Sequence, residues 1–255
     1  MVNRALVVNL GCLLNASELD RLRIVLVSPR NPLNIGAAAR AMSNFGCMHL
    51  RLVNPYEVAF RNARSAVGAA PLLASAAEYA SVAEAVADST LVVGTTAVRH
   101  RELQHPLRRL EIGGRLIRQH LAGSRVAVMF GSERFGLSNE DISHCHWLMN
   151  IPTREGHISM NLGQAVAICL YELVRSGSVK TRLAKAPSAD AGNIERMTTT
   201  LFEALRLSGY LKPKKEKSTE LKLRRMILRL HLQNNDAEAW LGMLRQILWK
   251  LSGDD

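Results

Sequence analysis

The stretch Val126-Ala-Val-Met-Phe130, which continues as Gly131-Ser-Glu-Arg-Phe-Gly-Leu-Ser138, joins an uninterrupted apolar run to a polar loop with two glycines. An apolar run without alternation is typical of a central strand in a parallel sheet, because such a strand is buried on both faces. The two glycines allow the loop backbone to approach a ligand closely or to adopt positive φ. An ordinary turn would explain the loop equally well, since Ser138 and Asp141 have the spacing of a helix start.

Strand-like and helix-like segments alternate on both sides of this stretch. The pattern predicts strands at 24–27, 49–53, 91–94 and 147–151, helices at 35–45, 110–121 and 161–174, and a mostly helical segment at 57–90. Alternating strands and helices predict an α/β fold with a parallel sheet covered by helices on both faces. Because ligands bind beyond the carboxyl ends of such strands, the candidate site lies in the loops after Val27, Val93, Phe130 and Ile151.

The composition changes to Ser, Gly, Ala, Lys and Pro between residues 177 and 192, which is typical of a linker. Beyond it, apolar residues recur at helical spacing in three stripes, which begin at Ile194, Leu223 and Leu241. The sequence therefore predicts an N-terminal extension at 1–20, an α/β domain at 21–176, a linker at 177–192 and a small all-helical domain at 193–255.

The chain carries 33 Lys and Arg residues against 22 Asp and Glu residues, for a formal net charge of +11. A surplus of this size favours a polyanionic partner, either nucleic acid or an anionic membrane surface, although a solvated basic surface would also explain it. No apolar run is long enough to span a bilayer. The four cysteines form no C-x-x-C pair and suit a reducing cytoplasm.

Several common signatures are missing from the sequence. No G-x-G-x-x-G follows a strand and there is no G-x-x-x-x-G-K-[ST], which argues against a dinucleotide-dependent dehydrogenase and a P-loop NTPase. The run His144-Cys145-His146 has no cluster of further ligands near it in the sequence. Structural residues are therefore a better interpretation of this run than a metal site.

Two further loops carry candidate functional side chains. In Asn31-Pro-Leu-Asn-Ile-Gly-Ala-Ala-Ala-Arg40, Gly36 and Arg40 share a helix face, so Arg40 either contacts a phosphate or ribose or is an ordinary surface residue. In Ile151-Pro-Thr-Arg-Glu-Gly-His-Ile-Ser-Met-Asn161, Ser159 and Asn161 either face a cofactor or cap the next helix. Taken singly, each loop leaves both interpretations open.

In this order, the segments resemble the motifs of the TrmH-like branch of the SPOUT RNA methyltransferases. Residues 23–27, 34–42, 52–55 and 91–95 look like the first half of the family pattern, and residues 128–140 and 159–166 look like its signature loops. The resemblance is close over residues 21–175. It is looser over 194–251, which resembles the helical tRNA-recognition region of the family, and the loop at 98–102 departs from the pattern.

The resemblance implies a parallel-sheet SPOUT fold with a C-terminal trefoil knot, and a homodimer whose active sites lie at the subunit interface. It implies a cytoplasmic enzyme that methylates a ribose 2′-hydroxyl in tRNA with S-adenosylmethionine and without a metal. The implied target is nucleotide 32, a cytidine or uridine of the anticodon loop. An rRNA 2′-O-methyltransferase and a non-catalytic RNA-binding protein with the same fold remain the alternatives.

The resemblance also implies roles for individual residues. The catalytic residues would be Arg40, Ser159 and Asn161. Arg40 would hold the ribose or its phosphate, because a guanidinium is normally protonated, with action as a base as the alternative. Glu133 would order the second loop. The cofactor contacts would be Thr95, Thr96, Ala97, Gly131, Ile151, Ile158, Ser159 and Met160. The RNA contacts would be Asn34, Arg40, Arg99, Arg101, Lys212, Lys214, Lys215, Arg224 and Arg225.

Overall fold

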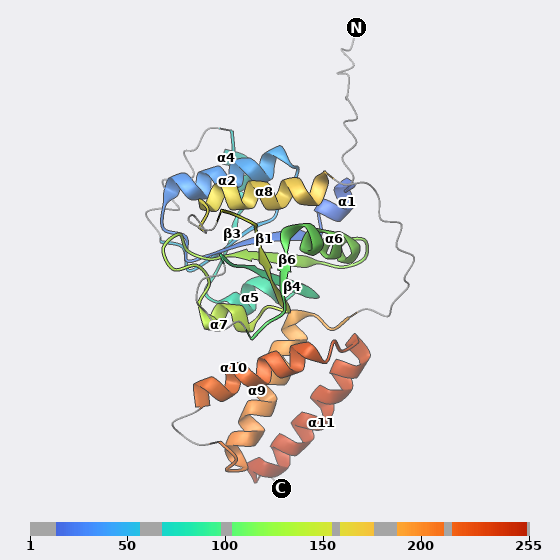
Figure 1. Ribbon diagram of the computed structural model, residues 1–255. Helices are drawn as coiled ribbons and strands as arrows, with labels where there is room; N and C mark the ends of the chain where they lie inside the picture. Colours follow the sequence, from blue (N-terminus) through green and yellow to red (C-terminus); the bar gives the residue numbers. More distant parts are fainter. Residues whose placement is uncertain are drawn as a thin grey trace.

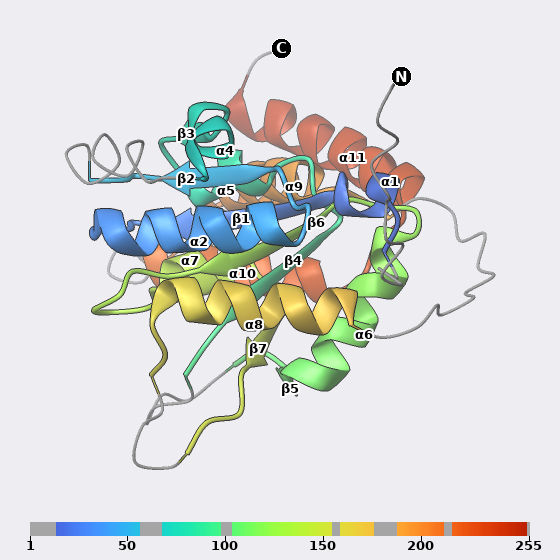
Figure 2. The same ribbon diagram turned by 90° about the horizontal axis from the view of Figure 1, so that it is seen from above.

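The computed structural model describes residues 14–56, 68–97, 104–154, 159–175, 188–211 and 216–253. A parallel sheet of seven strands forms its centre (Figure 1), in the order β3-β2-β1-β6-β4-β7-β5 (Figure 2). The strands are β1 (Leu22–Val27), β2 (Leu50–Val53), β3 (Ala77–Tyr79), β4 (Leu91–Thr95), β5 (Leu107–Arg109), β6 (Val126–Phe130) and β7 (Trp147–Asn150). The predicted parallel α/β architecture is confirmed.

Strand β6 occupies the middle of the sheet. It pairs with β1 on one side and with β4 on the other, so that Val128 lies opposite both Ile24 and Val93. All five of its residues are buried. Because helices cover both faces of the sheet, every position of this strand requires an apolar side chain, which explains why its sequence does not alternate.

Helices form a layer on each face of the sheet, above and below it in Figure 1. The layer on one face consists of α1 (Ala16–Leu19), α2 (Pro32–Asn44), α4 (Ala70–Ala74), α6 (Leu110–Leu121) and α8 (Leu162–Val174), and that on the other of α5 (Val82–Val86) and α7 (Asn139–Ser143). Alternate residues of β1 divide between the two cores, with Ile24 and Leu26 on the first and Val25 and Val27 on the second.

Helices α2 and α8 pack against each other at very short range. A Cβ atom added to Gly163 would come within 2.5 Å of the Cβ atom of Ala37, so only glycine fits at this point. The alanines of α2 leave room for this approach. The close packing fixes the start of α8 beside the start of α2, and both starts carry candidate functional residues.

The structure departs from the predicted elements in two places. The described part of 57–90 is not mostly helical, because β3 lies between two five-residue helices, α4 and α5. Strand β5 lies at Leu107–Arg109, where the sequence predicted no strand. Both missed strands are three residues long and lie at the edges of the sheet, so neither has the long apolar run of a central strand.

The described residues before residue 21 pack against the sheet domain. Asn15 caps α1 in a reciprocal capping box with Glu18. Leu14 and Leu19 are buried in the core beneath α2 and α8. The last residues of the stretch 1–20 therefore pack with the α/β domain.

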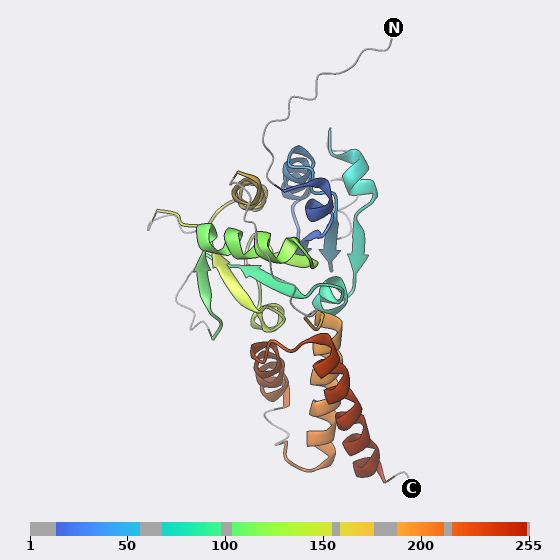
Figure 3. The same cartoon turned by 90° about the vertical axis from the view of Figure 1, so that its right-hand side faces the viewer.

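The C-terminal residues 188–211 and 216–253 form a helical module with its own small core (Figure 3). Its helices are α9 (Ala191–Leu207), α10 (Glu216–Arg229) and α11 (Asn234–Ser252), as the three apolar stripes predicted. Ile194, Met197, Ile227 and Leu241 meet at its centre. Helix α9 begins within the expected linker, and its first amide groups donate to the carbonyl oxygens of residues 87 and 89.

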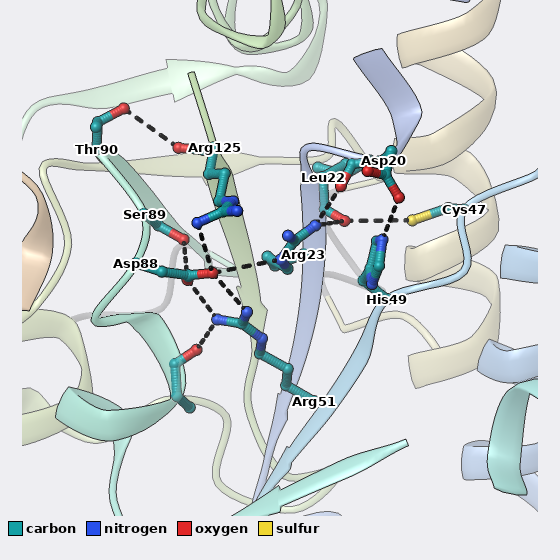
Figure 4. Close-up of polar contacts among 11 residues, drawn as sticks. Asp20, Leu22, Arg23, Cys47, His49, Arg51, Asp88, Ser89, Thr90 and Arg125 are labelled. Atoms are coloured by element: carbon teal, nitrogen blue, oxygen red, sulfur yellow. Dashed lines mark hydrogen bonds and ion pairs between the residues drawn. The ribbon is translucent and has the colours of Figure 1, made fainter. Parts of the chain in front are cut away.

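A charged cluster lies at the amino ends of the central strands (Figure 4). Arg51 binds Asp88 through two nitrogens, at 2.6 and 2.8 Å, while Arg23 and Arg125 each lie 3.7 Å from the same carboxylate. Burial alone would raise the pKa of Asp88, but its hydrogen bonds to Arg51 and the three positive charges outweigh burial and lower that pKa. This end of the sheet is thus closed by ion pairs.

Candidate functional site

A pocket of about 200 Å³ lies at the carboxyl ends of the neighbouring strands β6, β4 and β7. The chain contributes residues 95–97 after β4, residues 130–137 around the end of β6, and Ile151, Thr153, Ser159 and Met160 after β7. Ile142 of α7 and Leu162 and Ala165 of α8 complete the wall. Three of the four loops selected from the sequence therefore meet in one cavity, as the geometry of parallel sheets requires.

The structure brings together seven of the eight residues expected to contact a cofactor. The seven that line the pocket are Thr95, Thr96, Ala97, Gly131, Ile151, Ser159 and Met160. The eighth, Ile158, lies outside the described residues. The sequence analysis did not single out Leu137, Ile142 or Thr153, which also line the cavity. The signal for Leu137 and Ile142 was present, since apolar residues directly after a strand-end loop face inward.

The loop after β6 folds tightly back on itself. Ser132 and Gly136 form an isolated antiparallel bridge, in which the Gly136 amide donates to the Ser132 carbonyl at 2.8 Å. A Cβ atom on Gly131 would lie 2.0 Å from the carbonyl carbon of Gly136. Gly136 itself has a φ of +68°, a conformation that favours glycine. The backbone path around the pocket thus requires glycine at position 131 and favours it at position 136.

Hydrogen bonds across the strand ends fix the other walls. The Thr95 hydroxyl donates to the carbonyl of Met129 at 2.9 Å, and the Thr96 amide donates to the carbonyl of Met149 at 2.9 Å. The Asn150 side chain donates to the Thr96 carbonyl at 3.2 Å. These bonds join β4 to both of its neighbours at the edge of the pocket, so residues 95–97 are held on a rigid support.

Glu133 connects this loop to the start of α2. Its carboxylate accepts hydrogen bonds from the backbone amides of Arg30 and Asn31, at 3.2 and 3.0 Å, and from the side chain of Asn34 at 3.1 Å. Burial would raise the pKa of Glu133, but these bonds, together with one from its own backbone, outweigh burial and lower it. Glu133 is therefore an ionised acceptor that orders the loop.

Asn161 and Asn34 join the third loop to the same network. Asn161 caps α8, since its side-chain oxygen accepts from the amides of Gly163 and Gln164. Its side-chain nitrogen donates to the side-chain oxygen of Asn34 at 2.7 Å. Asn34 was expected to contact RNA, but both ends of its amide are engaged between Glu133 and Asn161. These two bonds hold Asn34 between the second and third loops, and its contact with RNA stays a prediction.

Arg40 lies outside the pocket of its own chain. Its side chain is exposed on α2 and is not among the residues that line the cavity. Ser159, by contrast, is exposed and lines the cavity directly. Of the three residues expected to be catalytic, the single chain therefore places only Ser159 in the pocket, with Asn161 supporting the wall.

The comparisons with known proteins agree with this geometry. The model of the SpoU rRNA Methylase family matches residues 21–171. The chain belongs to the SpoU rRNA methylase family. The resemblance to the TrmH-like motifs is thereby confirmed at the level of the family.

Individual relatives extend the match of this SpoU family member beyond the sheet domain. It is 32% identical to the tRNA (cytidine/uridine-2'-O-)-methyltransferase TrmJ of Pectobacterium atrosepticum, over 90% of this chain and 97% of that protein. It is 34% identical to TrmJ of Sodalis glossinidius, over 90% of this chain and 92% of the relative. The crystal structure of TrmJ from Z. mobilis matches with a TM-score of 0.78 and 31% identity, covering 88% of this chain and 98% of that one.

The RNA contacts expected of this SpoU family member are only partly described. Five of the expected RNA contacts lie outside the described residues, namely Arg99, Arg101, Lys212, Lys214 and Lys215. Arg225 is half-buried on α10. Arg224 requires a correction, because its side chain is only 5% exposed and is bound to Glu195 and Glu220. A guanidinium buried between two carboxylates is not free to bind a phosphate.

Two classes of feature are missing from the described ranges. None of the helices there is both long and apolar enough to cross a membrane. The same residues contain no group of three His, Cys, Asp or Glu side chains that could hold a metal ion. His146 of the run His144-Cys145-His146 is half-buried, and its Nδ1 accepts a hydrogen bond from the Val92 amide at 3.1 Å.

We expect Glu133→Gln to weaken binding of S-adenosylmethionine by about ten-fold, because an amide nitrogen would replace one of two oxygens that accept from backbone and side-chain donors. Calorimetry measures the change, with the exposed Glu111→Gln as a control. Since the folded-state pKa is lowered, the contribution of Glu133 is complete above the pKa of a free glutamate and is lost as the pH falls through the folded value. Unchanged affinity in Glu133→Gln would show that the loop is ordered by other contacts.

Proposed function

We propose that the chain transfers a methyl group from S-adenosylmethionine to a ribose 2′-hydroxyl in tRNA. The observation that carries the proposal is the pocket at the carboxyl ends of β6, β4 and β7. It is built from the three loops that carry the family motifs, and every described residue expected to contact the cofactor lines it. The names of the TrmJ relatives support tRNA as the substrate.

The pocket has the chemistry that S-adenosylmethionine requires. Apolar side chains for the flat adenine ring come from Leu137, Ile142, Ile151, Met160 and Leu162, while hydroxyl groups for the ribose and amino-acid portions come from Thr95, Thr96, Ser132 and Ser159. At the pocket wall, the backbone of Gly136 and Leu137 occupies the space that a Cβ atom on residue 131 would need, so only glycine fits there. When bound, the cofactor supplies a methyl group on a sulfonium, which is already a good leaving group.

The chain must do the rest of the chemistry on the acceptor. A ribose hydroxyl is a weak nucleophile until its proton is removed or strongly polarised. Arg40 is suited to hold the ribose or its phosphate and to stabilise negative charge on the hydroxyl oxygen, because a guanidinium stays protonated and donates in a fixed fork. Removal of the proton by Arg40 itself is the alternative. Ser159, at the pocket wall, would position the reacting groups.

The position of Arg40 supports a homodimer with active sites at the subunit interface. Arg40 is exposed and outside the pocket of its own chain, so a second chain is the natural route for bringing it to a pocket. Large apolar side chains are exposed on the adjoining helices α2 and α8, with Leu33 79%, Tyr171 56% and Ile168 38% exposed. Exposed apolar groups on neighbouring helices are typical of a subunit interface.

The trefoil knot of the SPOUT fold is part of the same proposal. The loops after β4, β6 and β7 would form it, since they already converge on the pocket.

We also infer a cytoplasmic protein. Cys47, Cys145 and Cys169 are buried free thiols, and burial raises the pKa of Cys47 and Cys169 to about 12, so they stay protonated as structural residues.

We propose nucleotide 32 of the anticodon loop, as cytidine or uridine, as the target. Support for tRNA over rRNA comes from the TrmJ relatives, whose similarity covers 90% of the chain and so extends into the helical module. The net charge of +11 suits a polyanionic RNA of either kind. An rRNA methyltransferase and a non-catalytic RNA-binding protein are the alternatives that the following experiment separates.

We expect ribose methylation at position 32 of tRNA to be present in cells that carry the gene and absent when it is deleted. Mapping of 2′-O-methyl groups in total tRNA and rRNA measures this directly. A loss confined to rRNA would favour the rRNA alternative. Calorimetry with purified protein and S-adenosylmethionine tests the alternative of a non-catalytic RNA-binding protein, because such a protein would show no cofactor binding.

A further inference from the structure

Helix α7 lies between the cofactor pocket and the helical module. Its residue Ile142 lines the pocket, and the next residue, Ser143, is fully buried on the side of the module. The Ser143 hydroxyl donates to the Glu140 carbonyl at 2.6 Å and accepts from Nη1 of Arg224 at 3.1 Å. Adjacent residues of one short helix thus contact the pocket and the module.

Arg224 is held firmly by the module itself. Its Nε and Nη2 atoms bind the two oxygens of Glu195 on α9, both at 2.8 Å, and Nη2 also binds Glu220 on α10 at 2.9 Å. The side chain is only 5% exposed. Because the two carboxylates fix the plane of the guanidinium, the remaining Nη1 group is aimed at Ser143 from a rigid support.

Two neighbouring contacts hold the same helix. Lys217 at the start of α10 pairs with Glu140 of α7 at 2.9 Å, although both side chains are largely exposed. His144, at the end of α7, lies 3.7 Å from Glu195. The Lys217 pair is solvated and contributes little, whereas the Arg224 contact is buried, so Ser143 is the main point of attachment.

A short, capped connection joins this point of attachment to the pocket. The loop 131–137 runs directly into α7 through Ser138, which forms a reciprocal capping box with Asp141. Leu137 and Ile142, on either side of this cap, are both pocket residues and both belong to the core beneath the sheet. Because this cap joins Ser143 to Leu137 and Ile142 through a single short helix, a shift of that helix at Ser143 would also displace the apolar wall of the pocket.

We propose that Ser143 and Arg224 are positioning residues that couple the helical module to the cofactor pocket, so that RNA on the module changes the affinity for S-adenosylmethionine. The inference rests on the proposed function of the pocket. The coupling is reciprocal, because a factor by which RNA changes cofactor affinity is the factor by which the cofactor changes RNA affinity. It would favour cofactor binding in the complex that is ready to react.

The test uses the full chain with Ser143→Ala, which removes one hydroxyl while leaving Arg224 paired with Glu195 and Glu220. The matched control is Ser208→Ala, which removes an equivalent hydroxyl bond to the carbonyl three residues earlier, on α9. Calorimetry gives the Kd and the number of sites for S-adenosylmethionine, with and without unfractionated tRNA. We expect the Kd of Ser143→Ala to rise about five-fold with an unchanged number of sites, and its response to tRNA to disappear.

Arg224→Lys provides a second, independent variant. An ammonium keeps the charge between the two glutamates but cannot hold Glu195 with two bonds and still reach Ser143. It should shift the Kd as Ser143→Ala does, and the double variant should be no worse than the larger single change.

The two proposals fail in different ways. If the wild-type chain binds no S-adenosylmethionine, the proposed function is overturned and this inference with it. If the wild type binds and Ser143→Ala binds equally well, or merely loses sites at an unchanged Kd, the coupling is overturned and the proposed function stands.

Discussion

Arg40→Ala is expected to reduce methyl transfer to tRNA by 10²- to 10³-fold, on the order of what is lost when a group that stabilises developing charge is removed. The Kd for S-adenosylmethionine should stay within about two-fold of the wild-type value, because Arg40 does not line the pocket of its own chain. Single-turnover transfer of a labelled methyl group, measured with saturating cofactor, reports the chemical step. Calorimetry on the same preparation reports cofactor binding.

Two further variants make the result specific. Arg40→Lys retains the charge but loses the planar fork, so an intermediate rate is expected if Arg40 holds a phosphate or ribose. Arg115→Ala removes another exposed arginine of the sheet domain and should leave the chemical step unchanged. If Arg40→Ala turned over at the wild-type rate, the role assigned to Arg40 would be wrong. Loss of cofactor binding would instead place its contact on the cofactor.

The centre of the fold could be predicted because its residues obey one dominant constraint. The run from Val126 to Phe130 is apolar throughout, and the structure buries all five residues in the central strand. The short edge strands β3 and β5 were missed, since three residues with exposed or half-buried side chains leave no periodic signal. Pairing with β2 and β7 holds them in place, and that pairing is a tertiary effect.

The site could be predicted only as far as topology determines it. The rule that parallel strands present ligand loops at their carboxyl ends brought Thr95, Gly131 and Ser159 together. Whether a single arginine is exposed or buried could not be predicted in this way. Arg40 is exposed while Arg224 is buried, although both lie on amphipathic helices. Glu220 is a local partner of Arg224, four residues away, but Glu195 and Ser143 lie 29 and 81 residues away in the chain, so no local pattern reveals these two.

Gly131→Ala is expected to abolish binding of S-adenosylmethionine, raising its Kd by more than about 100-fold. The added Cβ atom would lie 2.0 Å from the carbonyl carbon of Gly136 and 2.1 Å from the amide nitrogen of Leu137. Both are backbone atoms, so no side chain can rotate away and the loop that lines the pocket must open. Calorimetry measures the loss, and circular dichroism checks that the sheet remains folded.

Other glycines of the chain set the scale of this effect. Gly123→Ala introduces a Cβ atom with no neighbour within 4 Å and should bind normally. Gly136→Ala also meets no atom, but its φ of +68° makes alanine strained by about 1 kcal/mol, so a modest loss is expected. Normal binding by Gly131→Ala would mean that the turn between β6 and α7 has a different backbone path.

The two inactive variants together test whether Arg40 serves the pocket of a second chain. In a mixed dimer of Arg40→Ala and Gly131→Ala subunits, the first subunit keeps an intact pocket and the second keeps Arg40. If the guanidinium acts across the interface, one of the two sites in each mixed dimer is complete. Random mixing of equal amounts should then restore about a quarter of the wild-type activity, because half of the dimers are mixed. If Arg40 acts within its own chain, both sites of the mixed dimer are incomplete and the mixture stays inactive.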